Sequence, residues 1–160
     1  MPGSSATESL PTAADVVSEK RVLLFRDTNA WCPFCERVWL ALLEKGVPFD
    51  VTFIDLRDKP EWYLDMVPSA LVPAVKIDGE VVTESRDILH AIEDAFPEND
   101  GYAPLLPTEG TSERKRVEAL MDLADDPDEG VGTAGYRFLT GGAFGGSSDD
   151  EDALKMSELR

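Results

Sequence analysis

Two cysteines three residues apart, Cys32 and Cys35, are the side chains best suited to chemistry in this 160-residue sequence. They lie in Trp31-Cys32-Pro33-Phe34-Cys35, between a short apolar run at residues 22–25 and an amphipathic stretch. We expect the run to form a buried strand and Pro33–Lys45 to form a helix. Unpaired N–H groups and the macrodipole at a helix N-terminus favour negative charge. We therefore expect a lowered pKa for Cys32 and a nucleophilic thiolate near neutral pH.

The count of metal-binding side chains argues against a metal cofactor. A closed zinc site needs four ligands, and the sequence has two cysteines and one histidine, His90. One pair of neighbouring cysteines also cannot cross-link distant parts of a fold, as a framework of disulfides does. In a sequence without a secretion signal, such a pair is typical of redox or nucleophilic chemistry.

The two cysteines differ in how far the sequence defines their roles. A buried structural thiol is the alternative for Cys32, but its place at a helix start beside Pro33 favours a catalytic role. Cys35 lies one turn into the helix. It is either a resolving thiol or a small apolar side chain facing the sheet, and both interpretations stay open.

The net charge of −17 excludes some partners. Nucleic acids and anionic lipids need clustered Lys and Arg, so no nucleic acid is expected as a partner. No apolar run is long enough to span a membrane, so stable insertion is not expected.

Residues 1–20 are expected to be a disordered leader, and their acidic residues argue against a transit peptide. The expected compartment is the cytoplasm, with a plastid as the less supported alternative.

Periodicity predicts an α/β fold. Strands are expected at residues 21–26, 49–56, 73–77 and 81–83, the last two joined by the hairpin signal Asp78-Gly79. Besides Pro33–Lys45, helices are expected at residues 60–66 and 85–96, with Ser85 as the N-cap of the second. The order βαβαββα, with a four-stranded mixed sheet, is that of the thioredoxin-like fold.

The sequence divides into five predicted parts. After the leader come a thioredoxin-like domain at residues 21–98, a linker at 99–111 and one amphipathic helical region at 112–126. Residues 127–160 are acidic and rich in glycine, and we expect this tail to be disordered because it has too little apolar surface to bury.

Four motifs resemble those of a known family. They are Cys32-Pro33-Phe34-Cys35-Glu36-Arg37, Asp58-Lys59-Pro60-Glu61-Trp62-Tyr63, Leu71-Val72-Pro73 and Glu84-Ser85. Together they resemble the glutathione-binding domain of cysteine-type glutathione transferases, with the omega class and plant dehydroascorbate reductases as the most similar subgroups. The resemblance covers residues 22–98. The family carries an all-helical second domain, and since one helix is expected after the linker here, that region is expected to be truncated.

The resemblance implies a role for each motif. Cys32 would form a mixed disulfide with glutathione, and Phe34 would belong to the glutathione-binding residues. Pro73 would be cis, turning the Val72 backbone toward the cysteinyl part of glutathione.

The two ends of glutathione would be held by other motifs. Lys59 would bind the glycyl carboxylate. Glu84 would bind the γ-glutamyl ammonium and Ser85 its carboxylate, which agrees with the preference of helix N-termini for anions. A strand end followed by an N-cap is the purely structural alternative for Glu84 and Ser85.

The predicted function is that of a glutathione-dependent thiol transferase or reductase with Cys32 as nucleophile and glutathione as cosubstrate. The acceptor would be a small electrophile, dehydroascorbate or a disulfide, and a homodimer is compatible with the family. Two alternatives remain: a non-catalytic glutathione-fold module for binding or redox sensing, and a glutaredoxin-like dithiol oxidoreductase that uses Cys35.

Overall fold

The computed structural model describes residues 18–127, 130 and 134. The expected leader, up to residue 17, and nearly all of the expected tail therefore lie outside the described residues. The chain divides into two units between Pro107 and Thr108, and each is described by itself.

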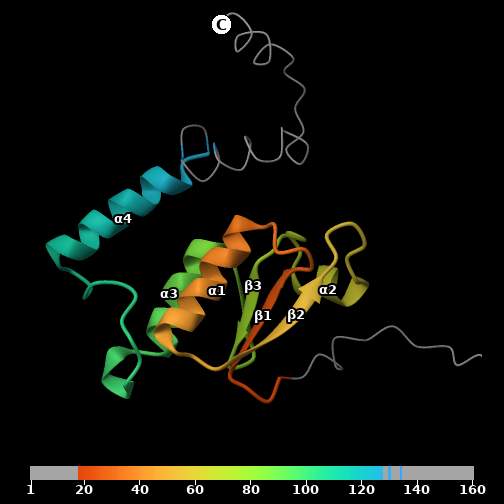
Figure 1. Cartoon of the computed structure of the whole chain (residues 1–160), viewed down its shortest axis with the longest axis horizontal. Helices are drawn as coiled ribbons and strands as arrows, with labels where there is room; N and C mark the ends of the chain where they lie inside the picture. Colours follow the sequence, from red (N-terminus) through yellow and green to blue (C-terminus); the bar gives the residue numbers. More distant parts are fainter. Residues whose placement is uncertain (1–17, 128–129, 131–133, 135–160) are drawn as a thin grey trace, which may run out of the picture. The chain divides into compact units, whose positions relative to one another are not determined.

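A four-stranded mixed sheet organises the first unit (Figure 1). Its strands are β1 (Val22–Asp27), β2 (Phe49–Ile54), β3 (Ala74–Ile77) and β4 (Glu80–Thr83), in the order β2-β1-β3-β4. Strand β1 pairs parallel with β2 and antiparallel with β3, and β3 pairs antiparallel with β4. The predicted order βαβαββα and the mixed sheet are thus confirmed, with the thioredoxin-like architecture they imply.

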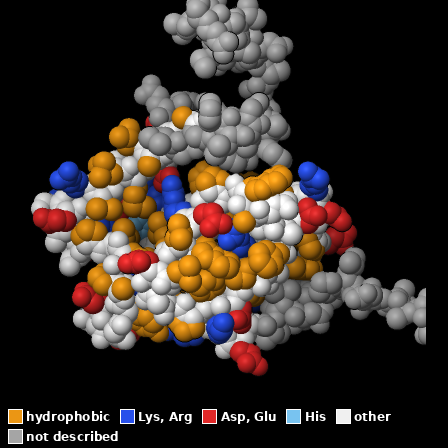
Figure 2. Space-filling view, in the orientation of Figure 1, with side chains coloured by type: hydrophobic (Ala, Val, Ile, Leu, Met, Phe, Trp, Pro, Cys, Tyr) orange, Lys and Arg blue, Asp and Glu red, His pale blue; other side chains and the backbone are white. Residues whose placement is uncertain are grey.

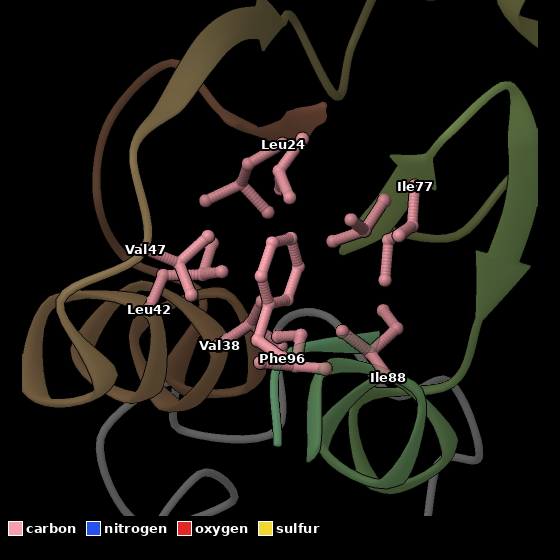
Figure 3. Packing of buried hydrophobic residues seen from close by; sticks show 10 residues of the cluster. Leu24, Val38, Leu42, Val47, Ile77, Ile88 and Phe96 are labelled. Atoms are coloured by element: carbon pink, nitrogen blue, oxygen red, sulfur yellow. The ribbon is translucent and has the colours of Figure 1, made fainter. Parts of the chain in front are cut away.

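Three helices cover the two faces of this sheet. They are α1 (Pro33–Lys45), α2 (Glu61–Met66) and α3 (Ser85–Ala95). Val22 and Leu24 of β1 pack with α1 and α3, in the cluster seen in Figure 3. Leu23 and Phe25 face the other way and pack with Tyr63 of α2. Because successive side chains of a strand alternate between faces, the central strand β1 is apolar on both sides.

Helix α1 has the predicted bounds. Pro33 occupies its first turn, where a missing N–H is tolerated. Gly46 ends it in the left-handed conformation, with φ 73°, and its N–H donates to carbonyls of the last turn. Val38, Ala41 and Leu42 are buried on the predicted inner side. The hairpin at Asp78-Gly79 is also confirmed, with positive φ at both residues as a two-residue turn of this kind requires.

The predicted capping of α3 is wrong by one residue. Glu84 is the N-cap, with φ 63° and ψ 118°, and its carbonyl accepts the first helical hydrogen bond from Ile88 N. Ser85 is the first helical residue. Its hydroxyl accepts a hydrogen bond from Arg37 Nη1, so it is engaged by a side chain of α1 instead of capping α3.

A short 3₁₀ turn follows α3 in the first unit, and a helix of 14 residues lies in the second unit. A 3₁₀ turn, η1 (Glu98–Asp100), lies at the start of the expected linker, and Leu106 within that linker is buried. In the second unit, α4 (Ser112–Asp125) is capped by Thr111, whose Oγ1 accepts from Arg114 N at 3.2 Å. Within the described part of the chain, neither α4 nor any other helix has the length and apolar character needed to cross a bilayer.

Candidate active site at one end of the sheet

Strand register brings most of the predicted site segments to one end of the sheet. Asp27 pairs with Ile54 at the carboxyl ends of β1 and β2. Ala74, at the start of β3, pairs with Phe25 and with Thr83 at the end of β4. The Cys32 loop, the Lys59 loop, Val72-Pro73 and Glu84-Ser85 each adjoin one of these strand ends. The Val72–Pro73 peptide bond is cis, as predicted.

Cys32 is the N-cap of α1 and is half-buried. Its Sγ accepts a hydrogen bond from Cys35 N at 3.3 Å, and as a thiol it donates to the Val72 carbonyl at 3.7 Å. The pKa of Cys32 falls to about 7, chiefly because the Cys35 thiol hydrogen-bonds to it, helped by the backbone N–H groups of Cys35 and Phe34 and opposed by burial. The lowered pKa therefore brings the ionisation of this sulfur close to neutral pH.

Cys35 is fully buried one turn into the same helix. The hydrogen bond it gives to Cys32, together with burial, raises its pKa far above the ordinary value. The pair is thus asymmetric: one sulfur carries the charge, and the other keeps its proton and stabilises that charge. A single turn of helix with one half-buried and one fully buried thiol produces this division.

A buried polar group that the sequence analysis missed lies beneath the two sulfurs. Asp27, 1% exposed, ends strand β1 and follows Arg26 and the apolar residues 22–25. Its Oδ2 accepts hydrogen bonds from Trp31 N at 2.6 Å and Cys32 N at 3.3 Å, so it holds the loop that carries Cys32. The available signal was a charged pair, Arg26-Asp27, closing an apolar run.

Arg26 places a buried positive charge next to the Asp27 carboxylate. Its Nη2 lies 3.7 Å from Asp27 Oδ1 and hydrogen-bonds to Glu36 of α1, and its guanidinium carbon lies 4.8 Å from the centre of the Trp39 ring. Asp27 Oδ1 itself has no hydrogen-bond partner. A buried carboxylate oxygen without a donor is uncommon and calls for a functional explanation.

Arg37 connects two of the predicted glutathione-binding residues. Its Nη1 donates to Ser85 Oγ at 3.1 Å, and its guanidinium carbon lies 5.7 Å from the centre of the Phe34 ring. Ser85 is buried at the start of α3, so the helix N-terminus and a guanidinium both place positive potential there. The sequence analysis did not select Arg37, because arginine on an exposed helix face is common.

Glu84 and Lys59 lie at the same sheet end by position in the chain. Glu84 is exposed and holds a backbone conformation, φ 63°, that side chains other than glycine rarely adopt. Such outliers concentrate at functional sites. Lys59 lies in the loop after β2, where its Nζ donates to the Leu56 carbonyl at 3.2 Å. In the part of the chain that the structure describes, no hydrogen bond joins Lys59 or Glu84 to Cys32.

A hollow lies beside the outer side of α1, and Arg37 is among the residues that line it. It has a volume of about 550 Å³ and lies between α1, α3 and the segment after η1, with apolar lining from Leu40, Leu43, Leu89, Leu105 and Leu106. Hydrophobic side chains cover much of the face seen in Figure 2, between scattered charged groups. Leu40 and Leu43 are 60% and 55% exposed, so the outer side of α1 is unusually apolar.

Comparison with known proteins points to one family. Residues 31–95 match the family model described as the glutathione S-transferase N-terminal domain. The glutathione S-transferase DHAR3, chloroplastic, of Arabidopsis thaliana is 37% identical over 64% of this chain and 39% of its own length. The probable glutathione S-transferase DHAR2, chloroplastic, of rice is 40% identical over 78% of this chain and 46% of its own length.

The solved structures include a rice glutathione transferase, GST1, in complex with glutathione. It is 30% identical and superimposes with a TM-score of 0.61 over 75% of this chain and 53% of its own. The chain spans less than half the length of each of these two curated relatives. The family match covers the sulfur pair, the cis-proline segment and the start of α3. Residues 31–95 of this chain therefore match the N-terminal domain of glutathione S-transferases.

Proposed function

We propose that this chain binds glutathione and uses Cys32 as the nucleophile of a thiol transferase or reductase. The observation that carries the proposal is the placement of a low-pKa sulfur at the start of α1, 3.7 Å from the Val72 carbonyl beside a cis proline. Its relatives are named glutathione S-transferases, and a solved relative is a complex with glutathione. The sequence-based prediction and the family therefore agree on the cosubstrate.

The residues around the sheet end supply complementary groups for glutathione. Ser85, with Arg37 at 3.1 Å, offers a hydroxyl and a positive charge for the γ-glutamyl carboxylate. Glu84 offers a carboxylate for the neighbouring ammonium, and Lys59 an ammonium for the glycyl carboxylate. Phe34 and the Val72 backbone would flank the cysteinyl part. These roles remain predictions carried over from the family resemblance.

The reaction follows from the ionised sulfur. The Cys32 thiolate attacks the glutathionyl sulfur of a mixed disulfide, forming a Cys32–glutathione disulfide and expelling the other thiolate. A second glutathione thiolate then attacks that glutathionyl sulfur, yielding glutathione disulfide and restoring the Cys32 thiolate. Exchange is fastest when the attacking thiol has a pKa near the ambient pH, as Cys32 has.

Turnover with a small glutathione mixed disulfide tests this function. Wild-type chain and the Cys32→Ser variant are compared, with binding of the glutathione analogue S-methylglutathione measured by calorimetry. We expect Cys32→Ser to abolish turnover while retaining binding. Full turnover in that variant, or no binding heat with either chain, would contradict the proposal.

A non-catalytic module is the second candidate. Calorimetry and turnover together separate the two candidates: binding without turnover by wild-type chain would favour the module.

The acceptor, the assembly and the compartment belong to the same proposal. Dehydroascorbate, a small electrophile and a disulfide are the predicted acceptors, and a homodimer is the predicted assembly. The predicted compartment is the cytoplasm, with a plastid as the alternative. The five-part division of the chain also stays a prediction.

A further inference from the structure

We propose that Asp27 is the general base that takes the proton from Cys35 when Cys35 resolves a mixed disulfide on Cys32. This inference deepens the proposed function and rests on it, because it needs Cys32 to act as the first nucleophile. It adds a dithiol route in which the chain forms its own Cys32–Cys35 disulfide.

The chemical need arises from the burial of Cys35. Its sulfur is 0% exposed, so bulk water cannot take its proton directly. In the resting state Cys35 donates its thiol proton toward the Cys32 thiolate. Once Cys32 is bound in a mixed disulfide, its sulfur carries no charge and cannot accept that proton. A resolving Cys35 therefore needs another acceptor inside the protein.

Asp27 meets this need by position. One of its carboxylate oxygens, the Cys32 sulfur and the Cys35 sulfur all lie within 4.8 Å of one another. Asp27 Oδ2 accepts hydrogen bonds from Trp31 N and Cys32 N, whereas Asp27 Oδ1 accepts no hydrogen bond. The carboxylate thus has one oxygen that fixes the loop and one that is available for a proton. Hydrogen bonds of this kind often tighten only when the reacting complex forms.

The other charged and titratable groups facing the pair do not provide a base. Arg26 is a cation that approaches Oδ1 at 3.7 Å and stabilises the carboxylate, and Glu36 of α1 is engaged by Arg26. Tyr63 of α2 keeps its proton, because burial and both sulfurs raise its pKa and its hydroxyl donates to Leu71 O at 2.7 Å. Among the residues that the structure describes, Asp27 is the carboxylate grouped with both sulfurs.

The step balances in atoms and charge. The Cys35 sulfur attacks the Cys32 sulfur of the mixed disulfide while its proton moves to Asp27. The bond between Cys32 and the bound thiol breaks, and that thiol leaves as a thiolate with the electron pair. One negative charge is present before the step, on Asp27, and one after it, on the leaving group. When glutathione later reduces the internal disulfide, Asp27 returns the proton to Cys35.

One equivalent of dithiobis(nitrobenzoate) tests the step in the full chain, which has two cysteines. Attack by Cys32 releases the first coloured thiolate, and displacement by Cys35 releases the second. The Asp27→Asn variant retains an amide oxygen for Trp31 N and Cys32 N but cannot accept a proton. We expect it to slow the second phase about 100-fold, within the usual range for general-base catalysis. The Cys35→Ser variant should release one thiolate only.

The controls separate this proposal from the proposed function. Asp55→Asn removes an exposed carboxylate after β2 and should leave the second phase unchanged. The first phase of Asp27→Asn reports whether the fold and Cys32 are intact. An unreactive Cys32 in wild-type chain would contradict the proposed function. A normal first phase with an equally fast second phase in Asp27→Asn, or no second phase in wild-type chain, would overturn the role of Asp27 alone.

The pH profile of wild-type chain keeps the test valid even if the variant does not fold. An internal carboxylate base makes the second phase level off over a range of neutral pH. A second phase that rises tenfold per pH unit throughout, as for a thiol that must first ionise into water, would overturn the proposal.

Discussion

The Cys35 thiol hydrogen-bonds to the Cys32 sulfur, and this contact is the largest single cause of the lowered Cys32 pKa. The backbone N–H of Cys35 adds a second hydrogen bond to the same sulfur at 3.3 Å. The second cysteine of the pair is therefore a partner of the nucleophile in the resting state, whatever its part in turnover.

Removal of the donor should raise the pKa of Cys32. In Cys35→Ala the thiolate loses its side-chain hydrogen bond, so the charged form is less favoured and the pKa should move from about 7 toward its ordinary value. Because only the thiolate reacts, alkylation of Cys32 at pH 7 should slow. Cys35→Ser retains a donor and is the matched control, with a smaller shift. The measurement is the iodoacetamide rate against pH, and an unchanged midpoint in Cys35→Ala would contradict the assignment.

Arg37 should contribute to glutathione affinity through Ser85. Arg37→Met removes the 3.1 Å hydrogen bond to Ser85 Oγ and the positive charge beside the predicted carboxylate site. A hydrogen bond to a charged group contributes about 1.5–3 kcal/mol, so we expect affinity to fall roughly tenfold or more. Calorimetry with S-methylglutathione measures the change. Arg116→Met, an exposed arginine of α4, is the control and should bind as wild-type chain does.

Sequence periodicity predicted the order of elements and the sheet because each apolar segment has one dominant partner. The bounds of α1 followed from Pro33 and Gly46, whose backbone preferences are local. Capping of α3 was mispredicted because Ser85 interacts with Arg37, 48 residues earlier in the chain. Local pattern contains no information about such a long-range contact.

The polar residues beneath the sulfurs were missed for a related reason. Arg26 and Asp27 resemble an ordinary charged strand end, and only the three-dimensional structure shows that both are buried. Cys32, in contrast, was predictable because its helix-start position is visible in the sequence. Sequence thus identifies the nucleophile more readily than the groups that control its proton chemistry.

A buried ion pair should stabilise the junction between α1 and α3. The Lys45 side chain is 0% exposed, and its Nζ donates to Glu93 Oε2 at 2.7 Å and to the Ala103 carbonyl at 3.0 Å. Lys45→Met leaves Glu93 without its cation, so we expect the free energy of unfolding to fall by about 3 kcal/mol. Urea denaturation measures this.

A surface pair provides the control for the Lys45 measurement. Lys20 pairs with Asp50 at the surface, where the side chains are 45% and 38% exposed, so Lys20→Met should change stability far less. Equal losses in the two variants would contradict the importance assigned to burial.

The loop before the cis proline should depend on Tyr63. The buried Tyr63 hydroxyl donates to the Leu71 carbonyl at 2.7 Å, one residue before Val72. Tyr63→Phe keeps the ring packing but leaves that carbonyl without this donor, so we expect a loss of about 1–2 kcal/mol in unfolding free energy. Thermal unfolding of this variant beside wild-type chain checks the prediction, and no loss would show that the contact is not stabilising.

The most direct test of the account is the reaction of the chain with glutathione disulfide, followed by intact mass and peptide mapping across pH. We expect the first glutathionyl group to be transferred to Cys32. Because Cys32 has a pKa of about 7, the rate of this transfer should rise with pH and reach a plateau just above neutral pH. Continued increase of the rate into the range of an ordinary free thiol, or initial modification of Cys35 in place of Cys32, would contradict it.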